Sequence, residues 1–214
     1  PNILASETLI FNRLVAKLSG YTKQPVHIIQ HLSHDNVTTN ERYERAIAYF
    51  RYGDLQNGKT DLDHLLQTEP NNPYFSELAG EVAFANADFP TAIQHFKLAL
   101  EGTNNAPLMA LRLGRILIAS NKAEDLELSV KILAIAVNGE PQWPFARKEY
   151  AIALGRNGQL AAADLQLAEA ALITNDKQQA SALAKRALAQ PDITVEIKKR
   201  LHDLQFLIQS SETP

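Results

Sequence analysis

The chain has no cysteine among its 214 residues. Disulfides, thiolate metal sites and cysteine nucleophiles are therefore excluded, although a lack of cysteine does not identify the compartment. No apolar run approaches the roughly 20 residues of a membrane-spanning helix, so we expect no transmembrane segment. Lysine and arginine form no block, the net charge is −3 and the pI is about 6.1. This charge pattern gives no indication of a nucleic-acid-binding surface.

Three prolines are spaced at nearly equal intervals. Pro73 and Pro107 lie 34 residues apart, and Pro107 and Pro144 lie 37 apart. A period of 34 residues is typical of the tetratricopeptide repeat (TPR), in which two helices form a hairpin and the hairpins stack into a solenoid. A small residue recurs seven positions after each proline, and once more 34 residues earlier, at Ala46, Gly80, Gly114 and Ala151. Small side chains at this position predict a close approach of the two helices of each hairpin.

The third repeat is three residues longer than the 34-residue period. Its second-helix positions, such as Leu133 and Ala136, come three residues later than their counterparts in the other repeats. We therefore expect the extra residues in a loop at 119–127, between the two helices of that hairpin. Glu124 and Asp125 are expected on the solvated surface of this loop.

These repeats predict an all-α protein, a right-handed TPR α-solenoid of stacked helix hairpins with a C-terminal capping helix. Residues 1–38 are expected to form an N-terminal linker helix and a connection, and residues 39–214 the solenoid. Repeats are expected at about 39–72, 73–106, 107–143 and 144–175, followed by a helix at 177–189 and the cap at 193–208.

The linker helix is predicted to be amphipathic and to run from residue 6 to about residue 19. Its apolar residues recur at helical spacing and lie on one stripe, formed by Ile10, Phe11, Leu14, Val15 and Leu18.

Signatures of catalysis and metal binding are weak. His27 and His31 have the spacing of a zinc-protease helix, with His34 one turn further, but Ile28 stands where that chemistry needs a glutamate as general base. No set of serine, histidine and carboxylate is evident, and the glycines form no phosphate-binding cluster. We therefore expect no catalytic residue, metal site or cofactor in this chain. The histidines are interpreted as the exposed face of a short amphipathic helix.

The inner wall of such a solenoid is formed by the first helix of each hairpin. The repeat register places these candidates for a protein-binding groove on that wall: Tyr43, Phe50, Arg51, Tyr74, Glu77, Glu81, Phe84, Arg115, Phe145, Lys148 and Arg156. Aromatic side chains beside isolated arginine and lysine suit the capture of a peptide or of another protein domain. The alternative is that about half of the apolar candidates belong to the core between repeats. A clamp for the C-terminal carboxylate of chaperone tails is not expected. Such a clamp uses lysine and asparagine at set positions on the first helices, and Tyr43 and Ile47 occupy the first of these positions.

Several stretches carry a more specific resemblance. They are similar to the C-terminal repeat region, and to the segment leading into it, of the BepA-like, TPR-containing zinc metalloproteases of the Gram-negative periplasm. The stretches are residues 12–18 (NRLVAKL), 42–51 (RYERAIAYFR), 71–80 (NNPYFSELAG), 106–108 (APL) and 151–158 (AIALGRNG). The similarity covers roughly residues 9–190 and fades after Pro191.

In that family, the signal peptide and the catalytic HExxH helix precede this region, so the resemblance assigns no catalytic residue to this chain. It implies a non-catalytic periplasmic module whose own protease domain, with its zinc, lies upstream. It also implies that the repeats pack on that domain and engage substrates or outer-membrane assembly partners. Because Pro1 is not an initiator residue, we expect the chain to be a piece of a longer protein.

Two other functions are compatible with the sequence. The first is a stand-alone TPR adaptor in the cytoplasm, which would use the same groove without a protease. The second is an enzyme that uses the histidine cluster.

Overall fold

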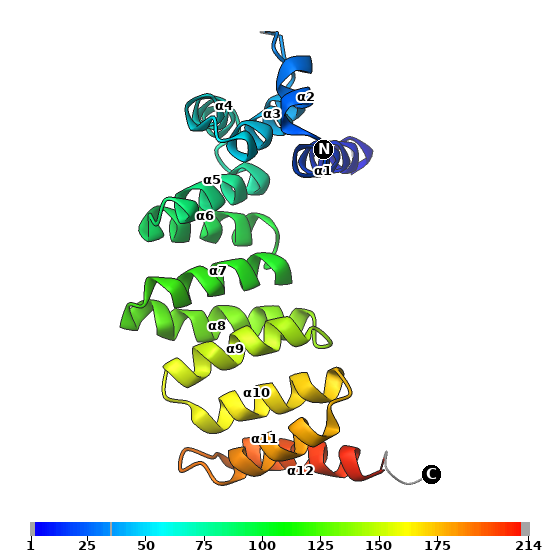
Figure 1. The fold of residues 1–214 in the computed structure, drawn as a ribbon, viewed down its shortest axis with the longest axis vertical. Coiled ribbons are helices and arrows are strands. Elements are labelled where there is room, and N and C mark those ends of the chain that lie inside the picture. The colour runs from blue at the N-terminus through cyan, green and yellow to red at the C-terminus, as the bar shows by residue number, and fades with distance from the viewer. Residues whose placement is uncertain (1–2, 35, 211–214) are drawn as a thin grey trace. The chain divides into compact units, whose positions relative to one another are not determined.

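The computed structural model describes residues 3–34 and 36–210 of the chain. Within these ranges the chain forms twelve α-helices and no β-strand (Figure 1). In chain order they are α1 (Ile3–Thr22), α2 (Pro25–His31), α3 (Thr39–Tyr52), α4 (Leu55–Thr68), α5 (Pro73–Ala85), α6 (Phe89–Gly102), α7 (Pro107–Ser120), α8 (Ala123–Gly139), α9 (Pro144–Arg156), α10 (Leu160–Ile173), α11 (Lys177–Leu188) and α12 (Val195–Ser210). None of the helices in the described ranges combines the length and the apolar character needed to cross a membrane.

The helices pair as hairpins within two compact units, unit 1 up to Gly102 and unit 2 from Thr103 onward. In unit 1, α3 packs on α4 and α5 on α6. In unit 2, α7 packs on α8, α9 on α10 and α10 on α11, while α12 buries Leu201 and Leu204 against α10 and α11 (Figure 1). The all-α fold of TPR hairpins that the repeats predict is confirmed.

Local sequence explains where the first helix of each hairpin begins. Pro73, Pro107 and Pro144 each stand in the first turn of their helix. A proline costs no hydrogen bond there, because the first N–H groups of a helix have no partner within it. Helix α3 lacks such a proline and begins with a capping box: Glu41 N donates to Thr38 Oγ1 at 3.3 Å, and Thr38 N donates to Glu41 Oε2 at 2.8 Å.

The small residues at the repeated position lie where two helices nearly touch. A Cβ atom added to Gly80 would lie 2.4 Å from Cδ2 of Phe96, and one added to Gly114 would lie 2.4 Å from Cγ of Leu133. Both distances are far below a van der Waals contact. The predicted close approach is therefore confirmed in the α5–α6 and α7–α8 hairpins.

The three extra residues of the third repeat lie within the predicted range 119–127, but they are helical and do not form a loop. The loop between α7 and α8 contains only residues 121–122, and α8 has 17 residues where α4, α6 and α10 each have 14. Three residues make almost one turn of 3.6 residues, so the helix can lengthen while its apolar face continues. Glu124 and Asp125 accordingly lie in the first turn of α8, where the helix dipole stabilises negative charge.

Candidate protein-binding surfaces

Helix α1 contacts the first helices of two hairpins, α3 and α5, through its charged face. The guanidinium of Arg13 lies 4.4 Å from the ring centroid of Phe75, and its Nη2 donates to Glu69 Oε1 at 3.0 Å. Lys17 forms an ion pair with Glu77, and the Tyr21 hydroxyl donates to the Glu81 carboxylate. The side of α1 that faces α3 and α5 is therefore basic, and it meets acidic residues.

This contact covers several of the residues predicted to line a groove in unit 1. Tyr43 is 1% exposed, and its hydroxyl donates to Tyr74 O at 3.2 Å. Burial, and next the charge of Glu77, raise the pKa of Tyr43 well above its usual value. Glu77 is itself buried against Lys17. With α1 in place, neither Tyr43 nor Glu77 is accessible to a partner protein.

Arg51 has a structural role at the end of α1. Its Nη1 donates to Gly20 O at 2.7 Å and to Lys23 O at 2.8 Å. These carbonyls lie at or just beyond the C-terminus of α1, where backbone acceptors lack partners within the helix. Arg51 thereby holds the end of α1 against α3.

A small, mostly apolar pocket of about 230 Å³ remains beside this contact. It brings together three of the predicted groove residues, Phe50, Arg51 and Glu81, and its remaining lining includes Tyr21, Ile47, Leu55, Leu78 and Val82. Phe84 is exposed nearby on α5 and packs edge-on against Phe89 at 6.0 Å.

The predicted groove residues of unit 2 lie on α7 and α9. The guanidinium of Arg115 stands 5.5 Å from the ring centroid of Phe145, and both side chains are largely exposed. Lys148 is also exposed. Arg156 is occupied, because it donates to Ile118 O at 2.9 Å and to Asn121 Oδ1 at 2.8 Å, at the end of α7. Phe145 and Lys148 are thus exposed, as is Arg115, whose Nε also lies 3.5 Å from Glu149 Oε1. Arg156, in contrast, holds α7 and α9 together.

The predicted apolar stripe of α1 faces away from α3 and α5. Its side chains are 47% to 64% exposed, at Ile10, Phe11, Leu14, Val15 and Leu18, and the neighbouring Leu9 is 52% exposed. An amphipathic helix usually buries this face. Here the opposite face is buried, with Ala16 in the core and Arg13 and Lys17 paired with acidic residues. A contiguous apolar stripe of this kind is typical of a surface that contacts another protein.

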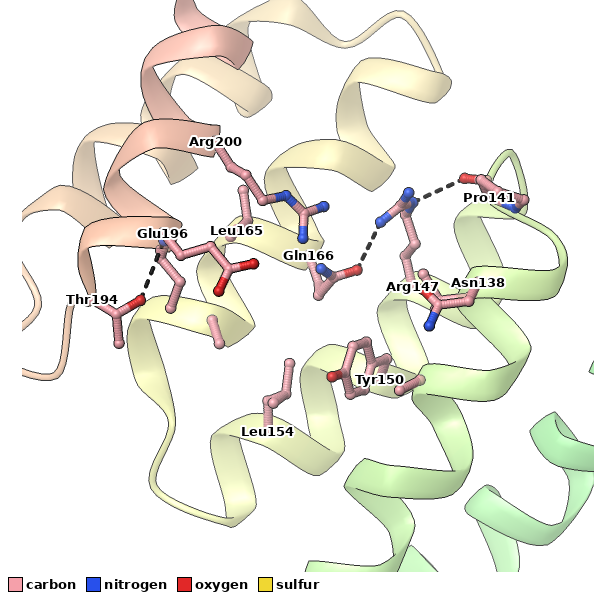
Figure 2. A pocket seen from close by; sticks show the side chains of 14 residues that line it. Asn138, Pro141, Arg147, Tyr150, Leu154, Leu165, Gln166, Thr194, Glu196 and Arg200 are labelled. Carbon is pink, nitrogen blue, oxygen red and sulfur yellow. Dashed lines mark hydrogen bonds between the residues drawn. The ribbon is translucent and has the colours of Figure 1, made fainter.

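A second cavity, of about 370 Å³, lies in unit 2 among α8, α9, α10 and α12 (Figure 2). Arg147 is buried at its edge. Nε of Arg147 donates to Pro141 O at 3.0 Å, and its Nη1 donates to Gln166 Oε1 at 2.8 Å and to the carboxylate of Glu169. Arg200 of α12 pairs with the same carboxylate.

One partly buried carboxylate, that of Glu169, therefore pairs with two guanidinium groups. Burial lowers the pKa of Arg147, Glu169 raises it, and the positive charge of Arg200 lowers it further. Burial also raises the pKa of Tyr150, whose hydroxyl points into the cavity (Figure 2). In the described ranges that hydroxyl has no hydrogen-bond partner. The cavity thus combines a cationic end with an unused hydroxyl.

The sequence did not predict this cavity, but a comparison of the repeats could have indicated one of its residues, Arg147. Arg42 in the first repeat bonds to Asp61, and Arg147 in the fourth bonds to Gln166. Each partner lies 19 residues after its arginine (61 − 42 and 166 − 147). Arginine at this position of the first helix therefore reaches a polar residue on the second helix.

The histidines lie apart from these surfaces. His27, His31 and His34 are exposed, and His27 and His31 line a shallow pocket with Lys23, Glu41 and Glu44. Across residues 3–34 and 36–210, no group of three histidine or acidic side chains is placed to hold a metal ion.

Comparison with solved structures shows a similar fold. The chain matches MamA of MSR-1 with a TM-score of 0.62 at 17% identity, over 81% of this chain and 98% of that one. It matches MamA, residue 41 to the end, from Desulfovibrio magneticus RS-1 with a TM-score of 0.63 at 16% identity, over 77% and 94%. At these identities the match shows the fold alone. No protein-family model and no curated protein sequence matches the chain.

Proposed function

We propose that the chain is a non-catalytic TPR interaction module of a periplasmic zinc metalloprotease. In this proposal α1 packs on the protease domain through its apolar stripe, and the inner wall engages substrates or outer-membrane assembly partners. The zinc belongs to the protease domain, and this chain supplies no catalytic residue. The observation that carries the proposal is the orientation of α1, with its basic face on α3 and α5 and its apolar face uncovered.

The energy available at the stripe supports a stable contact. Covering a half-exposed leucine, isoleucine, valine or phenylalanine gains about 1 kcal/mol. The five side chains of the stripe and the neighbouring Leu9 together offer about 6 kcal/mol, before the cost of association. That cost is small when both surfaces belong to one polypeptide. An adjacent domain of the same protein is therefore a favourable partner.

The exposed inner wall of unit 2 supports the second part of the proposal. The guanidinium of Arg115 lies over the ring of Phe145, and Lys148 follows one turn further along α9. This surface combines an aromatic ring with two positively charged side chains. Aromatic and arginine side chains supply most of the binding energy in protein interfaces. Their exposure leaves them available to a polypeptide partner.

The sequence encoded upstream of Pro1 gives the first test, because the proposal requires an HExxH helix there. The second test compares this chain with the full-length protein by hydrogen exchange. We expect the amides of α1 to exchange more slowly in the full-length protein, where the protease domain covers the stripe.

Substitutions test the stripe directly. Leu14→Ser combined with Leu18→Ser is expected to leave the melting temperature of this chain unchanged, because both side chains are already exposed. In the full-length protein the same pair should remove the extra protection of α1. Leu160→Ser, at an exposed leucine of α10, serves as the matched control. Equal exchange of α1 with and without the protease domain would contradict the proposal.

A stand-alone TPR adaptor is the second candidate. It is favoured by one observation: the MSR-1 MamA chain is matched over 98% of its length, so this fold also occurs as a separate chain in a solved structure. An upstream sequence without an HExxH helix would favour this candidate over the first.

A further inference from the structure

We propose that the cavity among α8, α9, α10 and α12 binds the C-terminal carboxylate of a peptide whose last side chain is apolar. The cavity lies in unit 2 and contains none of the residues predicted for the groove, so this site is separate from the inner wall. Its assignment does not depend on a protease domain.

The cationic end of the cavity supplies the donors for a carboxylate. Figure 2 shows the side chains of Arg147 and Arg200 converging on Gln166 from two sides. Of their nitrogens, Nη2 of Arg147 and both Nε and Nη1 of Arg200 make no hydrogen bond within the described part of the chain. Glu169 is the carboxylate that bonds to both guanidiniums there, and the unbonded nitrogens remain as donors for a further carboxylate. Guanidinium groups bind carboxylates through strong charge-assisted hydrogen bonds.

Part of the remaining lining is apolar and lies next to these donors, while Asn138 and Thr194 add polar groups. Val137, Leu154, Leu165 and Ile197 line the cavity beside the polar residues. In a C-terminal residue, the carboxylate and the side chain leave the same Cα atom. An apolar last residue therefore places its charge on the arginines and its side chain on these walls. A volume of about 370 Å³ lies at the small end of the range for ligand sites, which suits one terminal residue.

Helix α12 completes the site. Arg200 and Ile197 both come from α12, whose first turn is held by a hydrogen bond from Ile197 N to Thr194 Oγ1 at 3.2 Å. Glu196, also on α12, lines the cavity with its exposed carboxylate. This charge opposes an anionic ligand, and its removal should strengthen binding.

The test titrates the full 15N-labelled chain with three peptides and follows the amide and arginine Nε–H signals by NMR. The peptides are N-acetyl-Gly-Ala-Leu with a free carboxylate, its C-terminal amide, and N-acetyl-Gly-Glu-Leu amide. We expect the free acid to shift signals of α9, α10 and α12, and the first amide to bind at least about tenfold more weakly, the effect of one lost charge-assisted hydrogen bond.

Arg200→Gln should weaken the free acid about tenfold, whereas Lys199→Gln, on the exposed side of the same helix, should have no effect. The Arg200 side chain is 47% exposed, so the variant is expected to fold, and its circular dichroism spectrum checks this. Glu196→Gln should bind the free acid more tightly than the unmodified chain does.

Three results would overturn the assignment. The first is equal binding, or no binding, of the acid and the amide. The second is an unchanged affinity in Arg200→Gln. The third is equally strong binding of the amidated glutamate peptide, which would show that the site recognises an acidic side chain and not a chain terminus.

Discussion

A single methyl group at Gly114 tests the packing that defines the hairpins. Gly114 lies inside α7, and a Cβ atom there would stand 2.4 Å from Cγ, 2.6 Å from Cδ2 and 3.0 Å from Cδ1 of Leu133. Leu133 is 0% exposed and lies on α8. It cannot move aside without displacing other core atoms, because protein interiors are close-packed.

Two opposing terms determine the effect of Gly114→Ala. Overpacking a core costs about 1–3 kcal/mol, while replacing glycine by alanine inside a helix gains about 0.8–1 kcal/mol. We expect a net destabilisation of about 1 kcal/mol. Gly155→Ala is the matched control, because its Cβ would lie 3.8 Å from Cβ of Ala163, an ordinary contact. That variant should be unchanged or more stable by up to about 1 kcal/mol.

The only tryptophan of the chain, Trp143, makes the assay specific for unit 2. Urea unfolding followed by Trp143 fluorescence gives the free energy of unfolding of the unit that contains both substitutions. Leu133→Ala alone should cost about 2–5 kcal/mol. In the Gly114→Ala background it should cost at least about 1 kcal/mol less, because the added methyl fills part of the cavity.

Two results would refute this reasoning. One is a Gly114→Ala variant that is as stable as Gly155→Ala. The other is strict additivity of Gly114→Ala and Leu133→Ala, since groups that do not touch have additive effects.

Two further predictions concern unit 1. The Asp61 carboxylate, 3% exposed, accepts from Arg42 Nη1 at 2.9 Å and from Arg45 Nε at 2.7 Å. Asp61→Asn should cost about 3 kcal/mol of stability, because it leaves the two arginines without a full counter-charge. The control Asp63→Asn, at a half-exposed pair with Lys59, should cost less than about 1 kcal/mol. Equal melting temperatures of the two variants by circular dichroism would contradict this prediction. Burial lowers the pKa of His95 below its ordinary value of 6.5. The unfolded chain therefore binds the proton more readily than the folded chain does. The stability contributed by neutral His95 is thus present above about pH 6.5 and is lost as the pH falls below it. His95→Gln should therefore reduce the loss of melting temperature between about pH 7.5 and pH 5.5, while the control His64→Gln, at an exposed histidine, should not; identical pH profiles of the two variants would refute it.

The fold could be predicted because its signals are local and repeated. Pro73, Pro107 and Pro144 mark helix starts through backbone chemistry, and Gly80 and Gly114 mark helix contacts through size. Each signal depends on residues close in sequence, and the 34-residue period repeats it. The extra residues of the third repeat were expected in a loop and are helical, because a loop and an added helical turn both restore the period.

The candidate binding residues were harder to predict, because exposure depends on distant parts of the chain. The register placed Tyr43 and Glu77 on the inner wall, but α1 covers them through Arg13 and Lys17. The register also placed Arg51 among the groove residues, but in the structure its side chain binds the end of α1. Four of the predicted residues are largely exposed and have no described contact to α1: Phe84 of unit 1 and Arg115, Phe145 and Lys148 of unit 2. Their binding to a partner stays a prediction.

Sequence alone determined that the chain forms TPR hairpins, since helix starts, helix lengths and close contacts depend on short-range chemistry repeated along the chain. Tertiary structure alone decided which face of α1 is buried and which side chains enclose the cavity around Arg147. The buried face of α1 meets residues about 60 positions away, as in the ion pair of Lys17 with Glu77. Such pairings depend on positions in space, which the period of the repeats does not contain.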